Sequence, residues 1–144
     1  MKTLKTLVPI TLVIFFAFLI MKYASTRSYY SHDHPILNKV RDNFSKIDPK
    51  FSQIPLREGD SAYTENKEII TLCLKDPENN GTYYDMNTIM YVAIHELAHV
   101  CCESSGHGDE FKKKFSALLR HAANIGIYDP RKGIPSSYCG LNQN

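Results

Sequence analysis

Two histidines and a glutamate within one apolar stretch, His95-Glu96-Leu97-Ala98-His99, are the residues of this sequence best suited to do chemistry. On a helix, residues four apart project from the same face, so His95 and His99 can bind one metal ion together. Glu96 is rotated by about 100° around the helix axis and can flank the metal without binding it. This H-E-x-x-H pattern is typical of zinc metalloproteases, in which two imidazoles bind Zn²⁺ and the carboxylate is a general base.

The chemistry of such a site requires these residue types. Neutral imidazole is a good Zn²⁺ ligand, and bound Zn²⁺ lowers the pKa of a water ligand towards about 7. A carboxylate beside that water can take its proton and pass it to a leaving amine. The other residues of Tyr91–Cys102 are apolar all round, which predicts a buried helix. Polar groups on such a helix are costly unless they are paired or bound to metal, which favours a metal site.

A third ligand is expected, because zinc hydrolases usually use three protein ligands and one water. The best candidate is His107, eight residues after His99. Serines and a glycine just before it interrupt the first helix, and a new helix can begin near Gly108 or Asp109. A short turn there can fold His107 back onto the metal.

Other side chains are alternatives for this third position. Cys102 lies three residues after His99, close to the same helical face, and can bind zinc as a thiolate. The acidic residues of the same region are weaker options: Glu103, Asp109 and Glu110.

The motif and its surroundings resemble the WLM and SprT-like zinc metallopeptidases, which carry H-E-x-x-H followed by H-G-x-x-[F/W], here His107 to Phe111. The chain most resembles the short WLM-like metallopeptidases of large DNA viruses. Three further stretches carry that likeness: Ile69–Leu74, Tyr84–Thr88 and Pro135–Gly140. The resemblance covers roughly residues 67–141, about half of the chain.

This resemblance implies a fold and a site. The fold is an α+β, minimal zincin-like domain with a small sheet, an active-site helix and a second long helix. The site is one Zn²⁺ per chain bound by His95, His99 and His107, with Glu96 as the catalytic base. In zincins a strand beside the active-site helix often pairs with the substrate backbone, and the resemblance assigns that role to the strand expected over Lys67–Leu74.

The amino-terminal region predicts a membrane anchor. Residues Leu7 to Met21 form an apolar run of 15 residues between Lys5 and Lys22. As a helix this run reaches about 22 Å, short of the ~30 Å hydrocarbon core, although the flanking lysines can snorkel. We expect an uncleaved, single-pass signal-anchor that contacts the lipid bilayer through residues 7–21, with the side of the membrane left open. A cleaved secretory signal is the alternative, but Lys22 fits poorly before a cleavage site near Ala24.

The domain organisation follows from this assignment. We expect an anchor and its flank over residues 1–27, a tether over 28–34 and the metallopeptidase domain over 35–144, enough for one small domain. Four of the 17 basic residues precede residue 28, which leaves 13 against 15 acidic ones in the remainder. A slightly acidic domain gives no electrostatic reason to expect nucleic-acid binding.

The periodicity of apolar residues predicts the elements of the domain. We expect a helix from Pro35 that ends before Pro49, a strand over Lys67–Leu74, and a loop over Asp76–Thr82. Asp85 or Asn87 can cap the motif helix, and a second long helix is expected over about Gly108–Ile125. A short strand near Ile54 and Leu56 and an ordered carboxyl-terminal loop from Tyr128 complete the set.

Two features of the carboxyl-terminal half stay open at this level. Tyr138 either anchors the tail by packing or returns to the zinc and donates to an oxyanion. The four cysteines, Cys73, Cys101, Cys102 and Cys139, allow three full disulfide pairings. A bridge between the adjacent Cys101 and Cys102 is strained, and the sequence does not define the redox state.

Taken together, the residues predict a membrane-anchored zinc metallopeptidase that hydrolyses peptide bonds of a protein or peptide substrate. The alternative is a catalytically inactive, zinc-stabilised structural or interaction module in a membrane or virion. The two hypotheses share the metal site and differ in the role of Glu96. The oligomeric state is not predicted.

Overall fold

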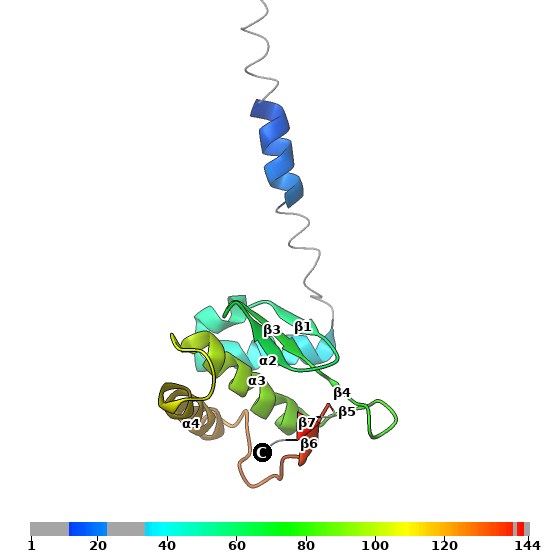
Figure 1. Cartoon of the computed structure of the whole chain (residues 1–144), viewed down its shortest axis with the longest axis vertical. Helices are drawn as coiled ribbons and strands as arrows, with labels where there is room; N and C mark the ends of the chain where they lie inside the picture. The colour runs from blue at the N-terminus through cyan, green and yellow to red at the C-terminus, as the bar shows by residue number, and fades with distance from the viewer. Residues whose placement is uncertain (1–11, 23–33, 140, 143–144) are drawn as a thin grey trace, which may run out of the picture. The chain divides into compact units, whose positions relative to one another are not determined.

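The computed structural model describes residues 12–22, 34–139 and 141–142. Contacts within the chain divide it into two compact units, residues 1–31 and 32–144. The second unit combines helices with three small sheets, so the predicted α+β class is confirmed (Figure 1).

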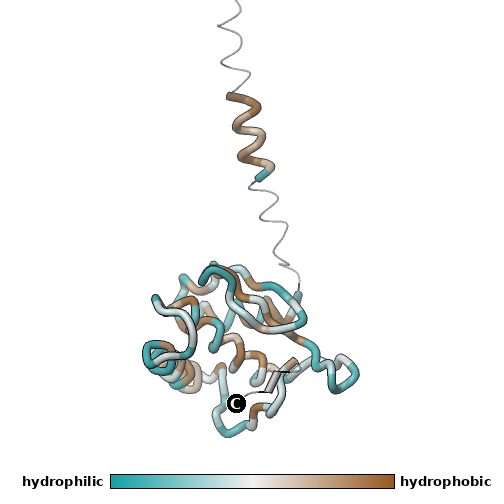
Figure 2. The backbone as a smooth tube through the Cα atoms, viewed as in Figure 1, coloured by the Kyte–Doolittle hydropathy of each residue, from teal (hydrophilic) through white to brown (hydrophobic). Residues whose placement is uncertain are grey.

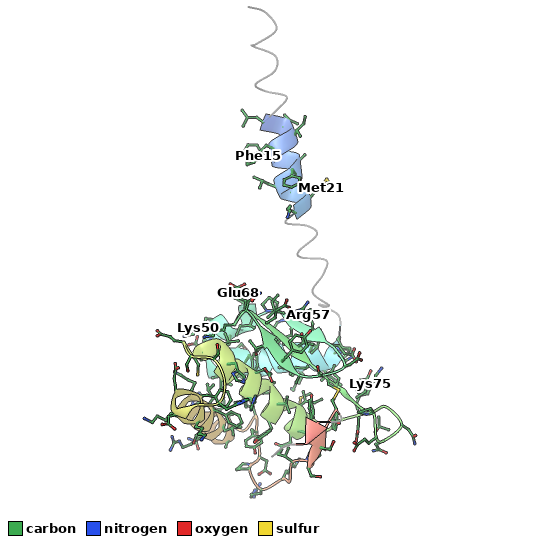
Figure 3. All side chains as sticks on the ribbon, in the orientation of Figure 1. Phe15, Met21, Lys50, Arg57, Glu68 and Lys75 are labelled. Carbon is green, nitrogen blue, oxygen red and sulfur yellow. A yellow bond between two sulfur atoms is a disulfide. The ribbon has the colours of Figure 1, made fainter. Side chains whose placement is uncertain are left out.

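The described part of the first unit is a helix over residues 12–22 with exposed apolar side chains, including Phe15 and Met21 (Figures 2 and 3). No helix among the described residues is long and apolar enough to cross a bilayer. The predicted single-pass anchor and membrane localisation are therefore contradicted. Residues 7–11 of the predicted span lie outside the described residues.

The first helix of the second unit, α2 (Pro35–Ile47), agrees with the prediction. His34 precedes it and accepts a hydrogen bond from the Ile36 amide at 3.3 Å, and the proline at the first position has no amide hydrogen that needs a partner. The helix ends at Asp48, which caps the 3-10 helix η1 (Pro49–Gln53). Three apolar residues of α2 are fully buried in the core: Leu37, Val40 and Phe44.

A three-stranded sheet covers the core beside the helices. Its strands are β1 (Leu56–Glu58), β2 (Tyr63–Glu65) and β3 (Ile69–Leu72), in the order β1-β3-β2. The central strand β3 runs parallel to β1 and antiparallel to β2. It is shorter than the predicted 67–74, because Asn66 and Lys67 have positive φ angles of 51° and 59° and form the β2–β3 turn.

The predicted loop over residues 76–82 is the tip of a short hairpin. Strands β4 (Lys75–Asp76) and β5 (Thr82–Tyr83) pair in antiparallel register at its base, where Lys75 lies in Figure 3. Asn80 and Gly81 adopt positive φ angles within the tip. Figure 2 shows that the projecting tip is hydrophilic, as a solvent-exposed turn requires.

Two long helices lie side by side and form the body of the domain (Figure 1). The first, α3 (Met86–Cys101), begins at Asp85, whose side chain accepts hydrogen bonds from the amides of Asn87 and Thr88. Asp85 is therefore the cap, and not Asn87. The second, α4 (Asp109–Asn124), ends just before Gly126, which has a positive φ angle of 75°. The buried apolar residues of α3 surround the whole helix, as predicted: Ile89, Met90, Val92, Ala93, Ile94, Leu97 and Ala98.

The carboxyl-terminal tail is fastened to the core by a disulfide bond between Cys73 and Cys139. Cys101 and Cys102 are free thiols. Next to the disulfide, β6 (Ser137–Tyr138) pairs with β7 (Leu141–Asn142), a pairing that the sequence did not predict. Because Cys73 follows β3, the bond joins the tail to the central strand of the sheet.

Candidate metal centre

Helix α3 presents His95 and His99 on one face, as their spacing of four residues requires. Their ring centroids are 5.1 Å apart, and both rings are partly exposed. Most other residues of α3 are buried, and only Met86, Tyr91, Val100 and Cys101 are partly exposed like the two imidazoles. A metal ion can reach the two imidazoles from solvent.

His107 joins the two helix histidines from the loop between α3 and α4. Its Nε2 atom lies 3.0 Å from Nε2 of His95 and 3.1 Å from Nε2 of His99. The ligand atoms of all three residues lie within 4.8 Å of one another. Two nitrogens bound to one Zn²⁺ at about 2.0–2.1 Å in tetrahedral geometry are roughly 3.3 Å apart, so the cluster has the dimensions of a zinc site.

The local sequence explains why His107 returns to α3. Helix α3 ends at Cys102, and Gly106 adopts a φ angle of 85° that glycine tolerates best. The next helix starts with Gly108 as its cap residue. One turn into α4, the buried ring of Phe111 packs against all three imidazoles, with centroid distances of 4.3 to 4.8 Å. The H-G-x-x-F spacing thus combines a ligand with the aromatic ring that supports the ligand cluster.

Electrostatics keep the helix histidines in the form that binds metal. Burial lowers the pKa of His95 to about 4, with the nearby His99 and His107 lowering it further. Burial also lowers the pKa of His99, together with His107 and Lys67. Both imidazoles are therefore neutral near pH 7, and neutral imidazole is the species that coordinates Zn²⁺.

Glu96 lies beside the histidine cluster and is 6% exposed. Burial raises the pKa of its carboxyl group, while a hydrogen bond from Thr64 opposes that rise. The Thr64 hydroxyl lies 2.8 Å from Oε2 of Glu96 and 3.0 Å from the backbone carbonyl of the same residue. Thr64 belongs to β2, so the edge of the sheet fixes the orientation of this carboxylate.

A cleft of about 890 Å³ opens over the cluster. Strand β2 forms one wall, and the loop before α4 forms another. Aromatic side chains, including Tyr91, Phe111 and Tyr138, supply much of the apolar surface. The partly exposed histidines are therefore accessible to a molecule that lies along β2, and the largely buried Glu96 lines the same cleft.

The alternative ligands do not join the cluster. Among the described residues, His95, His99 and His107 form the one group of three or more potential ligands. Cys102 is buried, and Glu110 instead accepts hydrogen bonds from the loop backbone. The metal-ligand prediction from the sequence thus coincides with the cluster, although ligation itself stays a prediction.

Tyr138 contributes to the cleft as a packed anchor. It is 1% exposed and stacks on Tyr84 with a centroid distance of 4.7 Å. Its hydroxyl donates a hydrogen bond to the backbone carbonyl of Cys73. Of the two roles considered from the sequence, this arrangement favours anchoring of the tail.

Sequence reasoning missed Thr64 and Lys67, the two residues that connect the β2 region to the site. Lys67 was considered only as the start of a strand. Both contact α3 or its end across more than 30 residues of chain. The aromatic and β-branched run at Tyr63–Thr64 was the one local signal for β2, and it is too short to be decisive.

Comparison with known proteins identifies the family of the chain. A model of the WLM domain family matches residues 64–136, half of the chain, and the chain belongs to this family. The match includes Thr64 and Glu65 of β2, both long helices and the three histidines. No solved structure matches the chain.

Relatives occur in large DNA viruses, which confirms the resemblance found in the sequence. Uncharacterized protein 136R of Invertebrate iridescent virus 6 is 42% identical over 89 residues, 61% of this chain and 50% of the relative. Uncharacterized protein 042R of Invertebrate iridescent virus 3 is 46% identical over 91 residues, 63% of this chain and 57% of the relative. Uncharacterized protein R325 of Acanthamoeba polyphaga mimivirus is 32% identical over 124 residues, 85% of this chain and 58% of the relative. The chain thus spans little more than half the length of these curated relatives.

Proposed function

We propose that this protein is a zinc-dependent metallopeptidase of the minimal zincin type. The ligands are His95, His99 and His107, and Glu96 is the general base. One observation carries the proposal: three imidazole nitrogens from two separate elements converge beside a buried carboxylate in an open cleft. Membership of the WLM domain family supports the same activity.

Glu96 performs the proton transfers in this proposal. When bound, Zn²⁺ supplies Lewis acidity, which polarises a carbonyl and lowers the pKa of a water molecule. The carboxylate of Glu96 takes the proton of the attacking water and delivers it to the nitrogen of the leaving amine. Burial raises its pKa and so makes it a stronger base than an exposed glutamate, while Thr64 holds its orientation.

The substrate is a peptide in extended conformation. The strand that the resemblance assigned to substrate pairing is the central strand β3, which already pairs with β1 and β2. The edge strand β2 pairs with β3 on one side and lines the cleft with Tyr63 and Thr64. A peptide backbone can add to the outer edge of β2, as in other cases of strand addition. Such pairing places a peptide bond beside His95 and Glu96 and depends little on the side chains of the substrate.

Turnover by the full chain tests the proposal. The zinc-loaded protein is expected to cleave an unfolded protein substrate, and Glu96→Gln is expected to abolish cleavage without loss of zinc. An inactive zinc-stabilised module predicts the same zinc content but no turnover that depends on Glu96. Equal cleavage by wild type and Glu96→Gln rules out the proposed mechanism.

A further inference from the structure

The loop that carries His107 is exposed along most of its length. Residues 103–110 are all exposed to solvent, including His107 itself. An exposed loop loses conformational entropy when it becomes ordered, so a ligand on such a loop binds metal weakly unless other contacts hold the loop. The charged side chains of Lys67 and Glu110 provide those contacts.

Lys67 holds the carbonyl groups at the start of the loop. Its Nζ atom lies 2.8 Å from the carbonyl oxygen of Cys102 and 3.3 Å from that of Ser104, and it also donates to the carbonyl of Glu103. These carbonyls follow the carboxyl end of α3, where helix carbonyls lack partners and the helix dipole is negative. A lysine ammonium group is suited to this position because it has three donors and a positive charge.

Glu110 holds the amide groups of the same segment. Its Oε1 atom accepts a hydrogen bond from the Glu103 amide at 2.9 Å, and Oε2 accepts one from the Ser104 amide at 3.0 Å. The hydroxyl of Ser104 also donates to Oε2. Glu110 belongs to the first turn of α4, so this carboxylate ties the loop to the second helix.

We propose that Lys67 and Glu110 are positioning residues that clamp residues 102–104 and thereby set the affinity of the protein for zinc. The inference rests on the proposed metal site. Both side chains bind the backbone three or more residues before His107, and the described contacts include none between them and an imidazole nitrogen. They act by fixing the path of the loop from its start at α3 to its end at α4.

The size of the expected effect follows from other metal sites. Loss of a residue that orients a ligand typically weakens metal binding by about 10–100-fold. Lys67→Met and Glu110→Gln are each expected to weaken zinc binding within that range. Because both residues hold the same segment, the double variant is expected to lose less than the product of the two single effects.

Because Lys67 is positively charged, its substitution distinguishes the clamp from a purely electrostatic effect on zinc binding. A positive charge near the cluster opposes the binding of a cation, so electrostatics alone predicts that Lys67→Met binds zinc more tightly. The clamp predicts the opposite result, that Lys67→Met binds zinc more weakly than the wild type. Lys67→Arg keeps the charge and the donors and is expected to restore most of the affinity.

The experiment measures the affinity of the full chain for Zn²⁺ alone by competition with a chelator. Lys113→Met and Glu68→Gln are the controls, because they make the same charge changes at exposed positions outside the clamp. The clamp predicts weakening of 10-fold or more in Lys67→Met and Glu110→Gln and changes below about 3-fold in both controls. Amide hydrogen exchange at Glu103 and Ser104 in the zinc-free protein is expected to be faster in both clamp variants.

The outcomes separate this inference from the proposed function. Wild-type zinc binding with unchanged or tighter binding in either Lys67→Met or Glu110→Gln overturns the clamp and leaves the metal site intact. Absence of zinc binding by the wild type overturns both. If Lys67→Met does not fold, the comparison of Glu110→Gln with Glu68→Gln decides between the clamp and a general effect of charge.

Discussion

The hydroxyl of Thr64 lies 2.8 Å from a carboxylate oxygen of Glu96, although 32 residues separate the two in the sequence. The contact joins the edge strand β2 to the motif helix α3. Because Glu96 is buried, few other groups are able to orient its carboxylate. The relationship gives the proposed base a fixed direction beside the histidine cluster.

Removal of this hydroxyl is expected to slow catalysis without loss of metal. Thr64→Val keeps the shape of the side chain but loses the donor. A hydrogen bond to a charged group contributes about 1.5–3 kcal/mol, so kcat is expected to fall roughly 10–100-fold. Thr64→Ser keeps the hydroxyl and should retain most activity, and zinc affinity should be unchanged in both variants. Full kcat in Thr64→Val contradicts the orienting role.

The Glu110 clamp predicts a specific acid dependence. Hydrogen bonds from the Ser104 hydroxyl and from the amides of Glu103 and Ser104, together with the charge of Lys67, lower the pKa of Glu110 from 4.5 to about 2. A lowered pKa in the folded state stabilises the protein above the unfolded value, and this contribution is lost as the pH falls from about 4.5 through about 2.

Nuclear magnetic resonance of the zinc-free protein checks this dependence. The amide signals of Glu103 and Ser104 are expected to titrate with a midpoint near 2, well below the ordinary value of 4.5. The same signals in Glu110→Gln should lose that transition. A midpoint near 4.5 in the wild type means that the carboxylate does not hold the loop.

The disulfide bond is expected to stabilise the fold but not the metal site. Cys73 and Cys139 are 66 residues apart, and closure of a loop of that length stabilises a folded protein by up to about 4 kcal/mol. Cys139→Ser should lower the free energy of unfolding by about 2–4 kcal/mol, measured with denaturant. Cys101→Ser, which removes a free thiol, is the control. A large loss of zinc affinity in Cys139→Ser contradicts the expectation that the disulfide stabilises the fold without affecting the metal site.

Phe111 is expected to affect both stability and metal binding. Its buried ring packs against His95, His99 and His107, so truncation removes the surface that supports all three imidazoles. Phe111→Ala should cost about 3–5 kcal/mol of stability and weaken zinc binding, while Phe111→Leu should lose less of both. Unfolding by denaturant and chelator competition measure the two effects. An unchanged zinc affinity in a folded Phe111→Ala protein contradicts the supporting role.

The sequence predicted the parts of the site that depend on local spacing. The interval of four residues between His95 and His99 fixes their shared face on α3, and the break before His107 allows its return. The apolar spacing of α2 likewise predicted a helix, and Pro35 and Pro49 predicted its limits. These features require only the geometry of a helix and the chemistry of proline and glycine.

Features that depend on distant partners were not predicted. Strand β2 has three residues and exists because β3 pairs with it, so its own sequence gives little signal. Thr64 and Lys67 gain their roles only when β2 and its turn are placed against α3. The same holds for the pairing of β6 with β7 and for the choice of Cys139 as the partner of Cys73.

The amino-terminal prediction was wrong for a different reason. A count of apolar residues over 7–21 measures hydropathy, whereas a membrane span also requires a helix of sufficient length. Among the described residues, no helix is long and apolar enough to cross a bilayer, which contradicts the predicted anchor.

Zinc content of the purified full chain, compared between wild type and His107→Ala, tests the central claim most directly. His121→Ala is the control, because His121 is an exposed histidine on α4 outside the cluster. The account predicts about one zinc per chain in wild type and in the control, and loss of most of that zinc in His107→Ala. Full zinc retention in His107→Ala, or absence of zinc from the wild type, contradicts the three-histidine site.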